Sequence, residues 1–208
     1  LSVQDSSSLS FPRARATEGL GPVTNNDTPG LKMHTAMLLN EEGMPLELIT
    51  QDVWARPKET KKESQSRRKR APIEEKESFK WLKSMREQRQ YFQEIPAEKR
   101  PRLYHIFDRE GDVHELMEDI REHSESCVIR SSQNRRASDE QGALGKAHDQ
   151  VAAAKKQGEI TVEVKRRGDR PARKATLEIR SVPLTLKASN AYSHRKPIPI
   201  TVVEARET

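Results

Sequence analysis

Two aspartates each follow a short apolar run, at points where a strand is expected to give way to a turn. Asp5 closes the segment "LSVQD", and Asp108 directly follows "LYHIF", whose end is marked by Gly111. A charge at the tip of a buried strand is costly unless it binds a partner. Because the two aspartates lie far apart in the sequence, only the fold could bring them together.

Converging carboxylates of this kind suit a hard divalent cation. If the two strands are neighbours in one sheet, Asp5 and Asp108 meet at its edge and offer oxygen ligands to Mg²⁺. Two bridged ions can activate water and stabilise the leaving 3′ oxygen of a phosphodiester. The structural alternative is that each aspartate is a turn residue or a helix cap. Asp112 and Glu115 fit a capping box for the following helix, so Asp108 is less needed as a cap.

The remaining reactive side chains form no catalytic or metal-binding pattern. Glu110 could be a ligand, an ion-pair partner of Arg109 or an exposed acid, and the last is the simplest interpretation. The six histidines have no metal-ligand spacing, and neither a Ser/His/Asp arrangement nor a glycine-rich phosphate loop is evident. The single cysteine, Cys127, excludes an internal disulfide and a cysteine-based zinc cluster, and it is expected in the core.

The composition indicates a lean core and a basic protein. Of the 208 residues, 33% are hydrophobic and 34% charged, which favours one compact domain with further exposed segments. The net charge of +6 is compatible with a polyanionic partner. No apolar run reaches membrane-spanning length and no signal peptide is visible, so we expect no membrane partner and a reducing, cytoplasmic setting.

Hydrophobic periodicity predicts a mixed first part. Strands are expected at residues 1–5, 31–39, 44–54, 103–107 and 126–132, and a tight turn at 40–43 joins the second and third into a hairpin. Helices are expected at 73–92 and from Val113 to Ile120, where apolar residues recur at helical spacing. The charged stretch 57–72, which contains "RRKR" (residues 67–70), is interpreted as a solvated linker or as a phosphate contact.

The character of the chain changes near residue 133. A polar, alanine-rich stretch leads to short alternating segments, "EITVEVKRR", "KATLEIRS", "PLTLKA" and "PIPITVVEARE", which are separated by Gly, Pro and Asn. Such repeated short strands indicate an antiparallel meander. We therefore expect a mixed α/β domain at residues 1–132 and a β-rich segment at 133–208.

Several segments resemble the IS-four family of DDE transposases. They are "DSSSLSF", "GLGPV", "GLKMHTAMLLNEEGMPLELITQDVWAR", "PIEEKESFKWL", "FDREGDVHELMEDI" and "RPARKATLEIRS", in the same order over nearly the whole chain. "DREGD" behind an apolar strand, together with "EEKES" and "KWL", is the most specific part. The resemblance implies an RNase H-like mixed sheet with flanking helices, interrupted by an antiparallel β-rich insertion.

The resemblance also implies a chemistry. Asp5 and Asp108 stand where the family has its first and second catalytic, metal-binding aspartates, and family members use Mg²⁺ or Mn²⁺, with two ions in the complete enzyme. The family's third acid lies on a helix after the insertion, in a signature of tyrosine, arginine, glutamate and lysine that this sequence lacks. We expect a fragment without both termini of its parent, with no strand-transfer activity alone.

The implied partners are double-stranded DNA, as transposon ends and target, and a second subunit, because the family works as a homodimer. Candidate phosphate contacts near the core strands are Arg109, Arg130, Arg135 and Arg136, although each could equally be a solvated arginine. The implied setting is the bacterial cytoplasm, at the nucleoid. Two other functions stay open: a nucleic-acid-binding protein that retains the fold without chemistry, and an RNase H-like nuclease unrelated to transposition.

Overall fold

The computed structural model describes residues 1–208 except 15, 24–27, 58–70 and 189–194. The predicted linker with "RRKR" lies largely outside these described residues. The chain divides into two compact units, Leu1–Ser132 and Gln133–Thr208, at the position where the sequence changes character. Both units are mixtures of strands and helices, and the described residues form two sheets and three α-helices.

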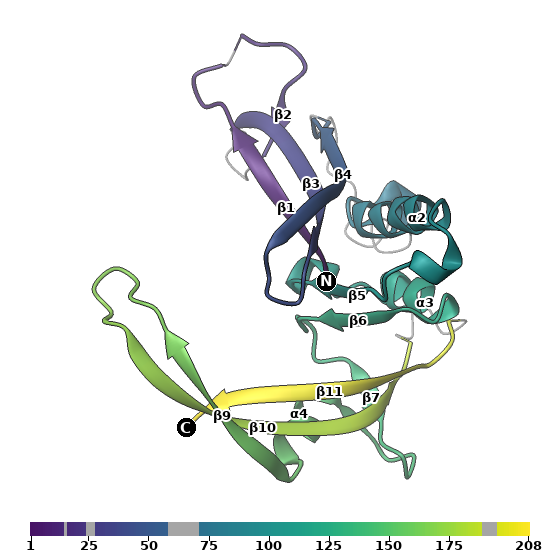
Figure 1. Cartoon of the computed structure of the whole chain (residues 1–208), viewed down its shortest axis with the longest axis vertical. Helices are drawn as coiled ribbons and strands as arrows, with labels where there is room; N and C mark the ends of the chain where they lie inside the picture. Colours follow the sequence, from purple (N-terminus) through teal and green to yellow (C-terminus); the bar gives the residue numbers. More distant parts are fainter. Residues whose placement is uncertain (15, 24–27, 58–70, 189–194) are drawn as a thin grey trace. The chain divides into compact units, whose positions relative to one another are not determined.

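The first unit is built on a six-stranded mixed sheet (Figure 1). Its strands are β1 (Ser2–Ser10), β2 (Gly21–Pro22), β3 (Pro29–Leu39), β4 (Pro45–Trp54), β5 (Tyr104–Phe107) and β6 (Ser126–Ile129). The order is β2-β3-β1-β5-β6, and β4 pairs with β3. β1 is antiparallel to β3 and parallel to β5, which in turn is parallel to β6. The predicted α/β class and mixed sheet are therefore confirmed.

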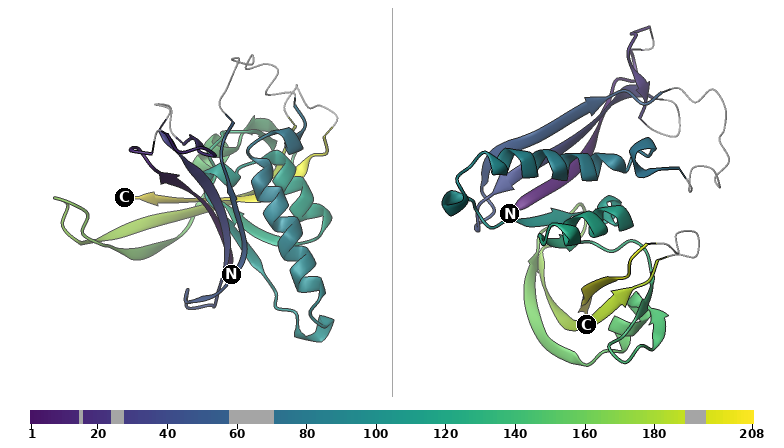
Figure 2. Two further views of the ribbon diagram at one scale, coloured as in Figure 1. Left: turned by 90° about the horizontal axis from the view of Figure 1, so that it is seen from above. Right: turned by 90° about the vertical axis from the view of Figure 1, so that its right-hand side faces the viewer.

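Two helices cover one face of this sheet (Figure 2). They are α2 (Phe79–Gln93) and α3 (His114–Glu122). α2 buries Trp81, Leu82 and Met85, and α3 buries Leu116 and Ile120 against the same cluster. The apolar face of α3 could be predicted from the helical spacing of its apolar residues. Burial of that face against the sheet stabilises the helix.

The predicted hairpin is confirmed, whereas the predicted bounds of the helix at 73–92 and of the strand at 1–5 were wrong. Asn40 caps the hairpin turn by accepting the backbone N–H of Glu42 and Met44. Residues 73–92 form not one helix but a short 3-10 turn, Ile73–Glu75, followed by α2, because Lys76 is extended.

β1 does not end at Asp5, as the serine run suggested, but continues to Ser10. Pairing with β3 holds the serines in the strand, and the Ser6 hydroxyl also hydrogen-bonds His34.

The second unit is a five-stranded sheet in which every pairing is antiparallel. It contains β7 (Arg136–Ser138), β8 (Leu144–Lys146), α4 (Ala147–Ala153), β9 (Lys156–Val164), β10 (Arg173–Leu186) and β11 (Ile198–Glu207). The antiparallel prediction is confirmed, but "KATLEIRS" and "PLTLKA" belong to the single strand β10. No helix among the described residues is long and apolar enough to cross a membrane.

Candidate active site on β1 and after β5

The register between β1 and β5 aligns the two aspartates. Ser2 pairs with His105 and Val3 with Ile106 in a parallel ladder. Asp5 and Asp108 have the same sequence offset as these pairs, and Asp108 still has extended backbone angles. The ladder ends at Val3 and Ile106; if the same register continued for two more residues, Asp5 would lie beside Asp108.

Both aspartates lie on the sheet face away from the helices. Side chains alternate along a strand, and Gln4 and Phe107, the residues before each aspartate, are buried on the helix side. Phe107 contacts Trp81 of α2 ring to ring, with centroids 5.8 Å apart. Asp5 and Asp108 are both exposed to solvent.

Polar residues continue this row on either side. Asp5 pairs with Thr35 of β3, and Thr35 pairs with Gln51 of β4. On the other side, the Arg130 N–H donates to the Phe107 carbonyl at 3.0 Å, which places Arg130 next to Asp108. If the β1–β5 register continues to the aspartates, a threonine, two carboxylates and an arginine form one row.

Asp108 is a cap residue, as the structural alternative predicted. Asp108 Oδ1 accepts the backbone N–H of Glu110 at 2.8 Å and caps the 3-10 turn Arg109–Gly111. The capping-box prediction was wrong, because the residue preceding α3 is Val113 and no side chain caps the helix. Asp112 is instead buried, and its Oδ2 accepts the backbone N–H of Ser132 at 2.7 Å.

This capping contact does not prevent Asp108 from binding a cation. A carboxylate has two oxygens and about four lone-pair positions, so one backbone N–H leaves acceptor capacity free for other partners. The same contact fixes the direction of the side chain. Asp108 is therefore held in one orientation at the sheet edge.

The donor set fits a hard divalent ion, but only in part. Two adjacent exposed carboxylates provide oxygen ligands of the kind that Mg²⁺ prefers, since Mg²⁺ keeps several waters and binds through one or two carboxylates. Among the described residues, no group of three or more His, Cys, Asp and Glu is placed to hold a metal ion. Asp5 and Asp108 could therefore supply two ligands, and other ligands would have to be water, phosphate or residues outside that set.

The candidate arginines fall into two groups. Arg109 and Arg130 are exposed; Arg109 follows Asp108 in the turn after β5, and Arg130 directly follows β6. Arg135 and Arg136 belong to the second unit, so the sheet of the first unit does not position them. Arg136 is exposed on β7 and Arg135 is half-buried.

A buried polar network beneath the site was missed by sequence reasoning. His34 lies between Gln4 Oε1, at 3.0 Å, and Ser6 Oγ, at 2.9 Å, and its ring packs edge-on against Trp81. Burial, followed by the charge of Lys80, lowers the pKa of His34 to about 4. The alternation of β3 put His34 on the face opposite its apolar residues, so the pattern pointed to an exposed histidine and gave no signal of this network. Cys127, expected in the core, is exposed on the edge strand β6.

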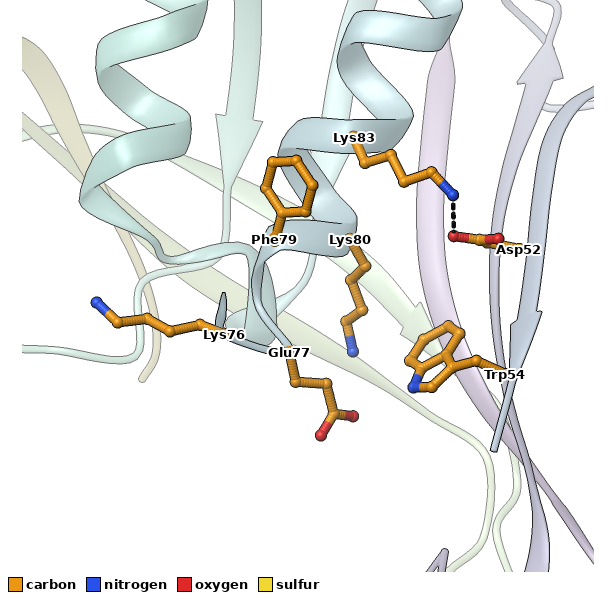
Figure 3. Close-up of a pocket in the computed structure, with 7 residues that line it drawn as sticks. All are labelled: Asp52, Trp54, Lys76, Glu77, Phe79, Lys80 and Lys83. Atoms are coloured by element: carbon orange, nitrogen blue, oxygen red, sulfur yellow. Dashed lines mark hydrogen bonds and ion pairs between the residues drawn. The ribbon is translucent and has the colours of Figure 1, made fainter. Parts of the chain in front are cut away.

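A shallow pocket opens on the helix side of the sheet, between β4 and the start of α2 (Figure 3). It is lined by Asp52, Trp54, Lys76, Glu77, Phe79, Lys80 and Lys83. Lys83 Nζ lies 2.6 Å from Asp52 Oδ2, and Lys80 Nζ lies 3.0 Å from Glu110 Oε2. Glu110 is thus an exposed acid, as predicted, but its partner is Lys80 rather than Arg109.

No model of a known protein family matches this chain.

Proposed function

We propose that this chain is part of the catalytic core of a DDE transposase, an enzyme that hydrolyses a DNA phosphodiester and joins the resulting 3′-OH to target DNA. The observation that carries the proposal is the shared register of Asp5 and Asp108. In that register, two carboxylates from distant segments would be neighbours on an exposed face, which is the arrangement a metal-dependent phosphoryl-transfer site needs.

The topology supports an RNase H-like core. Three antiparallel strands, β1, β3 and β4, are followed by two parallel strands that are reached through the helices α2 and α3. Ligand sites in mixed α/β sheets lie at the carboxyl ends of parallel strands. Asp108 directly follows one such strand, and the β-rich second unit corresponds to the expected insertion.

The charge distribution supports a DNA partner. Residues 133–208 carry 16 Lys and Arg against 9 Asp and Glu, whereas residues 1–132 carry 22 against 23. The net positive charge therefore comes from the second unit. Within it, Lys165, Arg166, Arg167 and Arg170 are exposed around the turn between β9 and β10. A cluster of exposed cations favours contact with phosphates.

In this proposal Asp5 and Asp108 hold Mg²⁺ or Mn²⁺, and Arg109 and Arg130 neutralise the neighbouring DNA phosphates. The bound ions supply the activation of water and the stabilisation of the leaving 3′ oxygen. Asp108 is kept in place by the Glu110 N–H, and the Asp5 backbone by its pairing with Thr35. The third acid and the homodimer expected from the resemblance would have to come from the complete protein, so this chain alone should not transfer strands.

Mn²⁺ binding tests the proposal on the chain itself. We expect electron paramagnetic resonance of free Mn²⁺ to show a weak site that Asp5→Asn or Asp108→Asn weakens by about tenfold or more, because each removes one of two anionic ligands. Glu98→Gln, an exposed acid outside the site, is the matched control. Binding that neither aspartate variant changes would contradict the proposal.

A second function, nucleic-acid binding without chemistry, is favoured by the basic second unit alone. It differs in one outcome. A nucleic-acid-binding protein without catalytic activity would bind duplex DNA, but it would show no Mn²⁺ binding that depends on Asp5 and Asp108. A nuclease unrelated to transposition would keep the metal site, and only the activity of the complete protein would separate it from a transposase.

A further inference from the structure

Lys80 is an enclosed cation close to the proposed metal site. It lies in the first turn of α2, and its side chain is only 10% exposed. Its Nζ lies 5.9 Å from the ring centroid of Trp54 and 5.7 Å from that of Trp81. Figure 3 shows the side chain reaching from the helix toward Trp54. An ammonium in such surroundings is stabilised by ring faces and by a carboxylate partner.

That carboxylate belongs to Glu110, in the same turn as Asp108. Lys80 Nζ lies 3.0 Å from Glu110 Oε2, while the Glu110 backbone N–H donates to Asp108 Oδ1. The Glu110 side chain is 61% exposed, so it is largely solvated, and the ion pair of its carboxylate with Lys80 holds it in place. Without Lys80, rotation about its side-chain bonds would let it turn toward Asp108.

The ion pair draws Glu110 toward the helix side of the sheet. α2 packs on the face that carries Gln4 and His34, whereas the alternation of side chains along β1 puts Asp5 on the opposite face. No third acid accompanies Asp5 and Asp108 among the described residues, although Glu110 is only two residues away in the sequence. Lys80 supplies the physical reason for this separation.

We propose that Lys80 is a positioning residue that keeps the Glu110 carboxylate away from Asp5 and Asp108, so that the metal site has two protein carboxylates and open positions for other ligands. This inference rests on the proposed metal site. The number of anionic ligands sets the affinity of an oxygen site for a divalent ion. A third carboxylate would tighten binding and occupy a position that phosphate or water needs.

The test is Mn²⁺ affinity in Lys80→Met, which keeps the apolar stem between the two tryptophans and removes the charge. We expect this variant to bind Mn²⁺ about fivefold or more tightly, because Glu110 becomes available as a ligand. In the double variant Lys80→Met/Glu110→Gln the affinity should return to that of the wild type. Lys80→Arg, which can keep the ion pair, should leave it unchanged.

Two controls separate positioning from a general charge effect. Lys83→Met removes a neighbouring cation that pairs with Asp52, and it should change Mn²⁺ affinity by less than about twofold, because that charge does not hold Glu110. Glu110→Gln alone should also leave the Mn²⁺ affinity unchanged. This variant keeps Lys80, so its result does not depend on whether a lysine variant folds. Lost affinity in Glu110→Gln would show that Glu110 is already a ligand and would overturn the inference.

The outcomes also separate this inference from the proposed function. Wild-type binding that depends on Asp5 and Asp108, with no gain in Lys80→Met, overturns the inference alone. A gain that survives Glu110→Gln does the same, because it would come from charge and not from a new ligand. Wild-type protein without Asp5- and Asp108-dependent binding overturns both.

Discussion

His34 is the group whose ionisation is altered most clearly by its place in the fold. It lies between the sheet and α2, bonded through both ring nitrogens, and burial lowers its pKa to about 4 from 6.5. Protonation of a ring in that position would add a charge with no carboxylate in direct contact. The surrounding carboxylates Asp52, Glu110 and Asp108 act in the opposite direction, and burial outweighs them.

Stability should therefore fall on acidification. The folded pKa of His34 lies below the unfolded value, so the unfolded chain takes up the proton first. The contribution of His34 to the free energy of unfolding is fully present above pH 6.5. It is lost as the pH falls toward 4, by up to about 3 kcal/mol. Urea unfolding followed by tryptophan fluorescence reports this, since Trp54 and Trp81 both lie in the first unit.

His34→Gln isolates that contribution. In the variant the free energy of unfolding should vary less between pH 6.5 and 4 than in the wild type, because one shifted group is gone. A residual slope from His105, whose pKa burial also lowers, should remain. An identical slope in variant and wild type would contradict the role of His34.

At the scale of elements, the turn after β5 is the part that positions Asp108. Gly111 allows this turn to lie against the strand, because a Cβ there would be 2.6 Å from Phe107 Cβ. That distance is below any normal carbon contact, so a side chain forces either the turn or the core residue Phe107 to move. The direction of the Asp108 carboxylate depends on the same turn.

Gly111→Ala should therefore lower the free energy of unfolding by about 1–3 kcal/mol. Gly158→Ala is the control, because a Cβ there meets no atom within 4 Å, and it should change stability by less than about 0.5 kcal/mol. Thermal unfolding followed by circular dichroism measures both. Equal midpoints for the two variants would contradict the close packing of the turn.

The elements differ in how well the sequence predicts them. α3 and the β3–β4 hairpin were predictable, because an apolar stripe and a short polar turn are local signals. The continuation of β1 past Asp5 was not, because serines are weak strand formers and pairing with β3 decides their conformation. The capping role of Asp108 was an alternative that the sequence offered, and it was set aside because Asp112 also fitted a cap position.

At the scale of the molecule, the two units differ in charge and so in the partner they suit. The parallel pairing of β1 with β5 joins segments that are distant in the sequence, and periodicity does not reveal such a pairing. The basic turn between β9 and β10 was readable as a charge cluster, but its exposure required the fold. Arg173, at the start of β10, pairs with Glu207, whereas the turn cations have no acidic partner among the described residues.

Replacing Arg166 and Arg167 with Gln should weaken binding to duplex DNA and flatten its salt dependence. Each lost phosphate contact lowers the slope of log affinity against log salt by about 0.9. Arg13→Gln/Lys99→Gln removes the same charge from exposed positions of the first unit and should alter the slope less. Fluorescence anisotropy across a salt series measures both, and equal slopes for the two variants would contradict a role of the turn.

The most direct test of the account is to locate bound Mn²⁺ by nuclear magnetic resonance in the isotopically labelled chain. We predict that low Mn²⁺ concentrations broaden the amide signals of Asp5, Thr35, Asp108 and Arg130 first, because these residues lie side by side at one place on the sheet. Asp5→Asn or Asp108→Asn should abolish the broadening of the whole group. Broadening of residues near only one of the two aspartates, or of another acidic region first, would contradict the proposed site.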